Sequence, residues 1–103
     1  MRLTRTREFK AVYDNRRRIP SGPLIVWARP NGLPHHRLGL AISRRVGGAV
    51  VRNRIKRRLR ECFRMIPPEP AVGYDLVIGA QRHDNGSIEL YRAAIERALR
   101  KLE

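Results

Sequence analysis

Apolar residues recur at helical spacing in three stretches of the chain. The first stretch follows Thr6 and the last follows Ser87, and both residues are candidate N-caps. The longest stretch covers residues 49–65, lies between two glycines and a proline-rich segment, and has the clearest periodicity in the sequence. The apolar positions are Phe9, Val12 and Tyr13, then Val51, Ile55, Leu59, Cys62, Phe63 and Ile66, and finally Ile88, Tyr91, Ile95, Ala98, Leu99 and Leu102. These patterns predict three amphipathic helices.

Three other stretches have the composition of strands. Residues 24–28 and 74–80 are short and apolar, which is typical of buried strands. Residues 37–43 alternate between larger apolar side chains and small ones, so a bulky group has room to pack over the small face. Residues 15–18 are expected to end the first helix and residues 20–23 to form a turn. The order of elements predicts one sheet packed against helices, in an α+β or α/β sandwich.

The length and composition are those of one folded domain, expected over residues 1–103. A chain of 103 residues with 42% hydrophobic content can bury a modest core. Arginines interrupt the N-terminal segment and no stretch approaches the ~18 apolar residues of a membrane span, so we expect a cytoplasmic protein with no membrane partner. Cys62 is the single cysteine, which excludes a disulfide or a cysteine metal cluster within one chain. We expect the protein itself to be monomeric.

Positive charge is concentrated in the first two thirds of the chain. Residues 1–66 carry a net charge of +15, whereas the remaining residues carry −1. Such a concentrated cation repels itself, and binding to a polyanion, most commonly a nucleic acid, relieves that repulsion. Arginine outnumbers lysine by 20 to 3, and a planar guanidinium can bind phosphate through two hydrogen bonds and stack on bases. The charge pattern therefore predicts a nucleic-acid-binding protein.

Most cations of the predicted long helix lie on the face opposite its apolar residues. A solvated helix face normally mixes charges of both signs, but here Glu61 is the one acidic residue among seven basic ones. The basic residues are Arg52, Arg54, Lys56, Arg57, Arg58, Arg60 and Arg64. At the helix start, Arg52, Asn53 and Arg54 add donors to backbone N–H groups that already favour anions, which predicts a phosphate site. Arg52 departs from the pattern, because its position projects toward the apolar side; we expect its side chain to reach out from the first turn and assign it no direction.

The segment from residue 37 to residue 60 resembles the bacterial ribonuclease P protein family. Its sequence is Arg37-Leu-Gly-Leu-Ala-Ile-Ser-Arg-Arg-Val46 and then Gly47-Gly-Ala-Val-Val-Arg-Asn-Arg-Ile-Lys-Arg-Arg-Leu-Arg60. The Arg-Asn-Arg-Ile-Lys-Arg run is the signature of the family, and the resemblance continues in order over nearly the whole chain. It implies an α+β fold, a two-layer sandwich of one small mixed sheet with three helices, of the split β-α-β type with a left-handed crossover.

The resemblance also implies a function. Members of the family bind a large catalytic RNA and help it to recognise precursor tRNA and to remove the 5′ leader, using Mg²⁺ bound mainly by the RNA. We therefore expect the chain to be a subunit of an endoribonuclease in which the RNA performs the catalysis, with no catalytic or metal-binding residue on the protein. The expected partners are ribonuclease P RNA and precursor tRNA, and no small-molecule substrate is expected.

Two groups of site residues follow from the resemblance. The signature helix and its neighbours would face the catalytic RNA. The matching positions are Arg52, Asn53, Arg54, Lys56, Arg57 and Arg60, and Arg44 and Arg45 extend this patch. The single-stranded leader would bind in a cleft between the first helix and the sheet, lined at matching positions by Phe9, Tyr13 and Trp27, and stacking on such rings tolerates many leader sequences. Phe9 has an equally good interpretation as ordinary core packing, and both can hold together.

Two positions depart from the family pattern. Gly48 stands where the family commonly has Asn, and glycine is an acceptable N-cap at a cost of about a few tenths of a kcal/mol. Arg16 stands where the first helix commonly leads into a turn that contains glycine.

Other functions are less well supported by the sequence. An independent enzyme would need paired acids, a nucleophile with a base, or a metal cluster, and His35, His36 and His83 lack such partners. The adjacent histidines are more typical of an exposed loop than of a metal site. A ribosomal-type protein or a general RNA chaperone shares the size and charge and is the main alternative. A duplex DNA binder, a membrane-surface helix and a calmodulin target fit less well.

Overall fold

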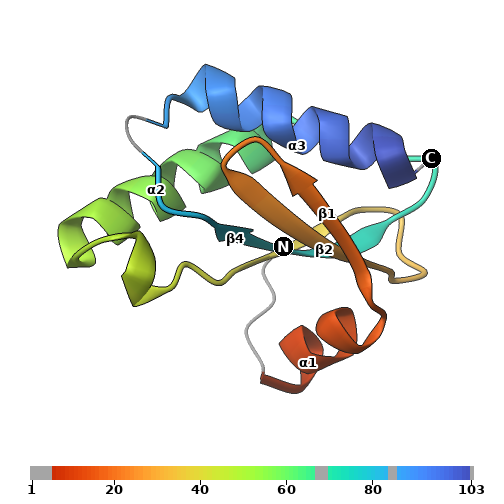
Figure 1. Ribbon diagram of the computed structural model, residues 1–103. Helices are drawn as coiled ribbons and strands as arrows, with labels where there is room; N and C mark the ends of the chain where they lie inside the picture. Colours follow the sequence, from red (N-terminus) through yellow and green to blue (C-terminus); the bar gives the residue numbers. More distant parts are fainter. Residues whose placement is uncertain (1–5, 67–69, 84–85, 103) are drawn as a thin grey trace.

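The computed structural model describes residues 6–66, 70–83 and 86–102. Within these ranges the chain forms three α-helices, four strands and one short 3-10 helix (Figure 1). In chain order the elements are α1 (Thr6–Asp14), β1 (Arg17–Ser21), β2 (Leu24–Pro30), β3 (Arg37–Leu40), the 3-10 helix η1 (Arg44–Val46), α2 (Ala49–Arg64), β4 (Tyr74–Ala80) and α3 (Ile88–Leu102). The three helices and three strands predicted from the sequence are all present.

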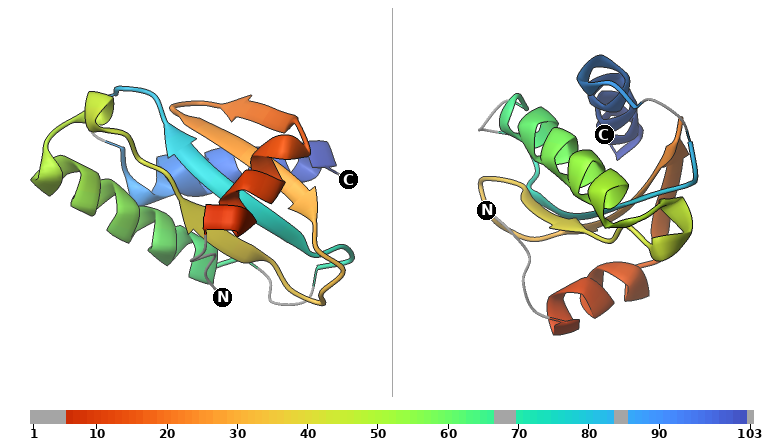
Figure 2. Two further views of the ribbon diagram at one scale, coloured as in Figure 1. Left: turned by 90° about the horizontal axis from the view of Figure 1, so that it is seen from below. Right: turned by 90° about the vertical axis from the view of Figure 1, so that its left-hand side faces the viewer.

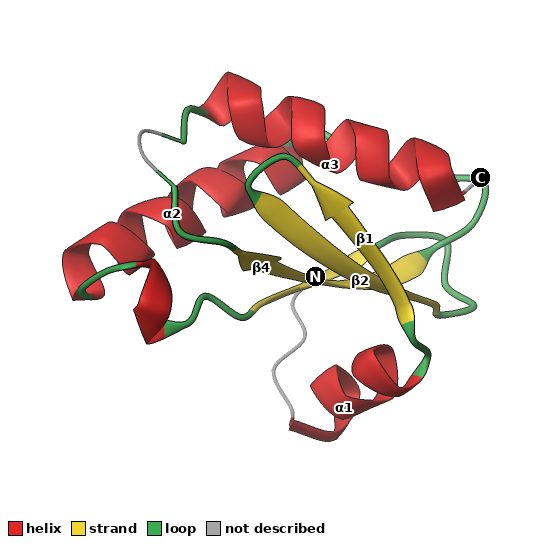
Figure 3. Cartoon of the chain, viewed as in Figure 1, coloured by secondary structure: helices red, strands yellow, loops and turns green. Residues whose placement is uncertain are grey.

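The strands form one mixed sheet in the order β1-β2-β4-β3 (Figure 3). β1 and β2 form an antiparallel hairpin, β2 pairs antiparallel with β4, and β3 pairs parallel with β4. Because parallel neighbours require a crossover connection, the chain leaves β3, passes through η1 and α2, and returns in β4. The small mixed sheet with a β-α-β unit, which the family resemblance implied, is confirmed.

Helices cover the two faces of the sheet unequally. α2 and α3 lie together on one face, and α1 lies alone on the other (Figure 2). The main core lies between the sheet and α2 and α3, as in the expected two-layer sandwich, and α1 adds a short layer on the second face. A smaller cluster of Val12 and Val77, with Phe9, Trp27 and Ala41 packed against it, joins α1 to the sheet. None of the described helices is long and apolar enough to cross a membrane.

The boundaries of α2 and α3 follow from local sequence. The Ser87 hydroxyl accepts a hydrogen bond from the backbone N–H of Leu90 at 3.1 Å, so Ser87 is the N-cap of α3 as predicted. α2 ends at Arg64, one residue before the predicted end, and the N–H of Met65 still donates to the carbonyl of Cys62 at 3.0 Å. The buried residues of α2 are Ile55, Leu59 and Cys62, all from the predicted apolar side.

The sequence pattern does not predict β1. It assigns residues 15–18 to a helix end and residues 20–23 to a turn, because Ile19 is the one apolar residue between the arginines and Pro20. β1 lies at an edge of the sheet, where a proline is tolerated because one side of the strand has no ladder to complete. β1 is therefore formed by its pairing with β2 and its burial against α3, and not by an alternation of apolar and polar residues in its own sequence.

The ends of β2 and β3 also differ from the prediction. β2 continues to Pro30, two residues beyond the predicted end, and pairs along its whole length with β4. β3 ends at Leu40 instead of residue 43, although the N–H of Ala41 still donates to the carbonyl of Ile78 at 3.0 Å. The chain leaves the sheet early because it turns into η1.

A partly buried network of ion pairs ties α1 to the sheet. The Arg37 guanidinium donates to both carboxylate oxygens of Asp75, at 2.7 and 2.6 Å, and to Glu8 of α1 at 3.1 Å. Asn31 donates to the same carboxylate at 3.0 Å. Asp75 is 1% exposed, and burial alone would raise its pKa, but the hydrogen bonds from Arg37 and Asn31 outweigh burial and lower this pKa below its ordinary value. We call these four residues the Arg37–Asp75 clamp.

Replacing Arg37 by methionine should destabilise the fold, because the Asp75 carboxylate would stay buried without its guanidinium. We expect a loss of about 2 kcal/mol in the free energy of unfolding at neutral pH, less than for a fully buried pair because the Arg37 side chain is 24% exposed. Since the folded-state pKa of Asp75 is lowered, its contribution is present above the unfolded carboxyl pKa and is lost as the pH falls through the folded-state pKa. Urea unfolding across this pH range measures both effects.

Lys10→Met is the matched control for Arg37→Met. It breaks a 2.8 Å ion pair with Asp14, but these side chains are 74% and 63% exposed, so water replaces the lost contact. The control should unfold close to the parent at every pH. If both variants lost the same stability, the clamp would be no more than another surface ion pair.

Candidate nucleic-acid interface

The outward side of α2 is a surface of cations. Burial of the apolar side against the core turns the opposite side to solvent. Arg54 and Arg57 are exposed there, and Lys56 and Arg60 are half-buried. Among the described residues, α2 has one ion pair, between Arg64 and Glu61 near its C-terminal end. The positive charge of these four residues, which we call the basic face of α2, is therefore not neutralised by a described acidic side chain.

The N-terminus of α2 is open to an anion. Gly48 is the N-cap and has no side chain that could cap the helix, so no N-cap side chain competes with a ligand for the first-turn N–H groups. Its φ of −70° is one that any residue adopts, so this position does not require glycine. Arg44 and Arg45 of η1 and Asn53 of α2 are exposed nearby in the chain, and η1 packs against α2. Cations at the positive end of a helix dipole strengthen anion binding, and the phosphate site at this helix start stays a prediction.

Two cations of α2 lie apart from the basic face. Arg52, whose direction the sequence pattern leaves open, is half-buried, and its Nε atom is buried without a hydrogen-bond partner among the described residues. Arg58 donates from Nη1 to the carbonyl of Gly86 at 2.6 Å and so ties α2 to the segment before α3. Arg58 therefore supports the fold, and Arg52 retains an unused donor.

Phe9 fixes α1 on the second face of the sheet. A Cβ atom at Gly39 would lie 2.7 Å from Cζ of Phe9, so the phenyl ring lies directly on the glycine. A bulky group therefore does pack over the small face of β3, as predicted. Phe9 is half-buried against the cluster of Val12 and Val77, which confirms its interpretation as core packing. Its role in leader binding stays a prediction.

Tyr13 and Trp27 meet edge to face on the same side of the sheet. Their ring centres lie 5.1 Å apart and the ring planes cross at 86°. Trp27 is half-buried over Gly79, where a Cβ atom would lie 3.1 Å from the indole. Tyr13 is 37% exposed, and its partial burial raises the pKa of the hydroxyl, which stays neutral and able to donate. Phe9, Tyr13 and Trp27 form what we call the aromatic site, in which Tyr13 is the most open to a ligand.

Sequence reasoning missed Arg18, which belongs beside the aromatic site. Arg18 pairs with Trp27 across β1 and β2, and its guanidinium carbon lies 6.0 Å from the centre of the indole ring. In a strand, neighbouring side chains point to opposite faces, so Arg18 shares the face of Trp27 and Arg17 does not. This alternation does not apply at a helix end, which is what the sequence pattern predicts for residues 15–18. The failure to predict β1 therefore hid this residue.

The histidines have structural contacts and do not form a shared site. His36 is buried, so the prediction of an exposed loop is wrong for this residue, and its Nδ1 accepts the backbone N–H of Tyr74 at 2.9 Å. Burial lowers the pKa of His36. His83 contacts the hydroxyl of Tyr91, and His35 is half-buried. Within the described part of the chain, no group of three or more His, Cys, Asp or Glu residues could hold a metal ion.

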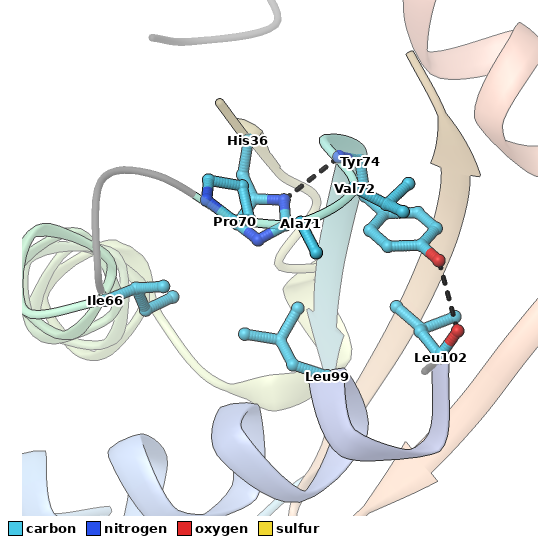
Figure 4. Close-up of a pocket in the computed structure, with 8 residues that line it drawn as sticks. All are labelled: His36, Ile66, Pro70, Ala71, Val72, Tyr74, Leu99 and Leu102. Atoms are coloured by element: carbon cyan, nitrogen blue, oxygen red, sulfur yellow. Dashed lines mark hydrogen bonds between the residues drawn. The ribbon is translucent and has the colours of Figure 1, made fainter. Parts of the chain in front are cut away.

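A cavity of about 370 Å³ lies beside His36, near the C-terminal end of α3 (Figure 4). The Tyr74 hydroxyl donates to the carbonyl of Leu102 at 3.1 Å on one side of it. The lining residues are His36, Ile66, Pro70, Ala71, Val72, Tyr74, Leu99 and Leu102. This lining contains no lysine or arginine, so the cavity differs in chemistry from the basic face of α2.

Comparison with known proteins identifies the family. The family model named Ribonuclease P matches residues 1–103. The ribonuclease P protein component of Caldanaerobacter subterraneus is 36% identical over 101 residues, covering 97% of this chain and 87% of that one. The corresponding protein of Desulfovibrio desulfuricans is 39% identical over 99 residues, covering 93% and 76%. The solved RNase P protein from Thermotoga maritima matches with a TM-score of 0.82 at 26% identity, covering 100% and 98%. The chain belongs to the ribonuclease P protein family.

Proposed function

We propose that the protein is the protein subunit of ribonuclease P. It binds the catalytic RNA through the basic face of α2 and the 5′ leader of precursor tRNA through the aromatic site. It thereby assists the endonucleolytic removal of the leader that gives the mature 5′ end. One observation carries the proposal. α2, whose basic face has no acidic partner among the described residues, lies on one side of the sheet, and the aromatic site lies on the other. One small chain can therefore hold two RNA segments.

The basic face of α2 is suited to the folded catalytic RNA. Cations that contact phosphates release condensed counterions, which supplies affinity without any requirement for sequence. Exposed Arg54 and Arg57 have no acidic partner to give up among the described residues, so phosphate binding breaks no ion pair of theirs. The full set proposed for the RNA is Arg44, Arg45, Arg52, Asn53, Arg54, Lys56, Arg57 and Arg60.

The aromatic site is suited to an unpaired strand. A base stacked on an aromatic ring gains about 1–3 kcal/mol and every base has a face that can stack, so the site accepts leaders of different sequence. Tyr13 offers the accessible ring, while Phe9 and Trp27 are held in place over Gly39 and Gly79. The packed Trp27 ring thus positions the Tyr13 ring that it meets edge to face.

The chemistry is assigned to the RNA subunit. Mg²⁺ takes oxygen ligands, whereas the basic face of α2 presents N–H donors and positive charge that repel a divalent cation. We therefore place the Mg²⁺ ions on RNA oxygens and give the protein binding and positioning roles, as a single copy without a catalytic residue. The match over residues 1–103 supports this function over that of a ribosomal-type protein or a general RNA chaperone.

Reconstitution tests the proposed function directly. The protein should be inactive on a 5′-extended precursor tRNA by itself, and it should strongly increase leader removal by a bacterial ribonuclease P RNA at low Mg²⁺ concentration. Cleavage by the RNA without protein is the control. Unselective RNA binding without stimulation would contradict the proposal and favour the chaperone alternative.

Changing Arg54 and Arg57 together to glutamine should weaken binding to ribonuclease P RNA and flatten its salt dependence. Each lost phosphate contact should reduce the slope of log K against log salt by about 0.7–0.9. The matched control changes Arg97 and Arg100 to glutamine, which removes the same charge from exposed positions of α3. Filter binding over a salt series measures the slopes. Identical slopes for both double variants would mean that net charge, and not the basic face of α2, decides binding.

Changing Tyr13 to alanine should weaken the affinity of the holoenzyme for precursor tRNA by about 1–3 kcal/mol, the value of one stacked base. Affinity for mature tRNA and for ribonuclease P RNA should not change, because neither carries a leader. Tyr13→Phe keeps the ring and should retain most of the affinity. An equal loss for all three RNAs would indicate a folding defect, and thermal unfolding of the free variant checks this.

A further inference from the structure

Two arginines that the proposed sites do not include, Arg16 and Arg18, lie in the turn after α1 and in β1. Arg18 lies opposite Trp27 in the β1–β2 ladder, with its guanidinium carbon 6.0 Å from the indole centre. The neighbouring positions Ile19 and Ser21 are buried on the other face of β1, toward α3. Arg18 is exposed, so its side chain covers part of Trp27 while the charge remains open to solvent.

Arg16 occupies a backbone conformation that disfavours an arginine. Its φ is +60°, and it is the one residue other than glycine with a positive φ among the described residues. The left-handed region costs a residue with a side chain about 1–2 kcal/mol, whereas glycine adopts it freely. The turn is held by the N–H of Arg16 donating to the carbonyl of Tyr13 at 3.0 Å and by the Asn15 amide donating to the carbonyl of Ala28 at 2.9 Å. An unfavourable residue at a tightly held turn points to a use for its side chain.

Both arginines keep their charge available. No salt bridge joins Arg16 or Arg18 to an acidic residue of the described chain, and Asp14, which precedes this turn, is paired with Lys10 at 2.8 Å. Both side chains are exposed. α1 ends at Asp14, one residue after Tyr13, and the turn leads from there into β1 at Arg17 (Figure 1). Positive charge therefore continues from the aromatic site onto β1.

We propose that Arg16 and Arg18 bind phosphates of single-stranded RNA that passes over Tyr13 and Trp27, and so extend the aromatic site along β1. This inference rests on the proposed function, because it takes leader binding at Tyr13 as its starting point. A guanidinium has donors in its own plane, so Arg18 can remain against the indole and still bind a phosphate oxygen. Aromatic stacking joined to a basic track is the general arrangement for binding single strands without sequence preference.

The first test compares Arg18→Gln with Arg17→Gln. These neighbours lie on one strand and lose the same charge, but Arg17 projects to the other face, where its Nη2 donates to the carbonyl of Lys101 at 2.7 Å. Holoenzymes carrying each variant are titrated with precursor tRNAs that have either a long leader or one too short to pass Tyr13. For the long leader, Arg18→Gln should lose about threefold to tenfold in affinity and reduce the salt slope by about 0.7, the value for one phosphate contact on a single strand. Arg17→Gln, and either variant with the short leader, should match the parent.

The second test uses the strained backbone. Arg16→Gly removes the side chain and relieves the left-handed conformation, so its melting temperature should be no lower than that of the parent. Its affinity for the long-leader precursor should nevertheless fall. A variant that loses binding while keeping its stability separates a contact with RNA from a structural role.

The outcomes separate this inference from the proposed function. If Tyr13→Ala weakens long-leader binding while Arg18→Gln and Arg16→Gly do not, the aromatic site stands and the extension along β1 is wrong. If Arg17→Gln loses as much affinity as Arg18→Gln, the effect is one of net charge and the extension is equally wrong. If Tyr13→Ala has no effect on precursor binding, the proposed leader site itself fails.

Discussion

The burial of the apolar side of α2 against the sheet is the constraint from which the arrangement of charge follows. Ile55, Leu59 and Cys62 are at most 5% exposed and recur every three or four residues, so they hold one side of the helix inward. Burial of apolar surface is worth about 25 cal/mol per Å², and rotating the helix to hide its cations would forfeit that contribution and also bury charge. The basic face of α2 is therefore a consequence of the core. The core sets its direction, and the sequence of the outward positions sets its chemistry.

On the second face of the sheet, α1 is held by other interactions than those that hold α2. Gly39 and Gly79 leave room for the rings of Phe9 and Trp27 to lie against the backbone, and the Arg37–Asp75 clamp fixes the same helix by charge. α1 is thus held by close fit and by an ion pair, with a small apolar cluster between it and the sheet. A larger core here would bury the rings completely. The modest packing of α1 leaves Tyr13 accessible.

The parts of the fold that the sequence predicts are those in which one element carries its own signal. The periodicity of α2 predicts its apolar side and the departure of Arg52, and Ser87 predicts the start of α3. β1 has no such signal, since its segment around Ile19 is formed by pairing and by contact with α3. Arg18 could not be assigned without that strand. Likewise, the hydrogen bond of Arg58 to Gly86 joins segments 28 residues apart, which no local pattern reports.

The two proposed RNA surfaces have in common that neither reads base identity. Phosphate contacts and stacking both tolerate any sequence, so in the proposed function selectivity for a precursor tRNA would come from holding two RNA segments at a fixed separation. A molecule with extents of 35 × 28 × 21 Å, whose surfaces sit on opposite sides of one sheet, provides a short and rigid spacer. Binding at the first surface then raises the effective concentration of the leader at the second, but only for an RNA complex of matching geometry. Weak and unselective contacts thereby become selective through their spacing.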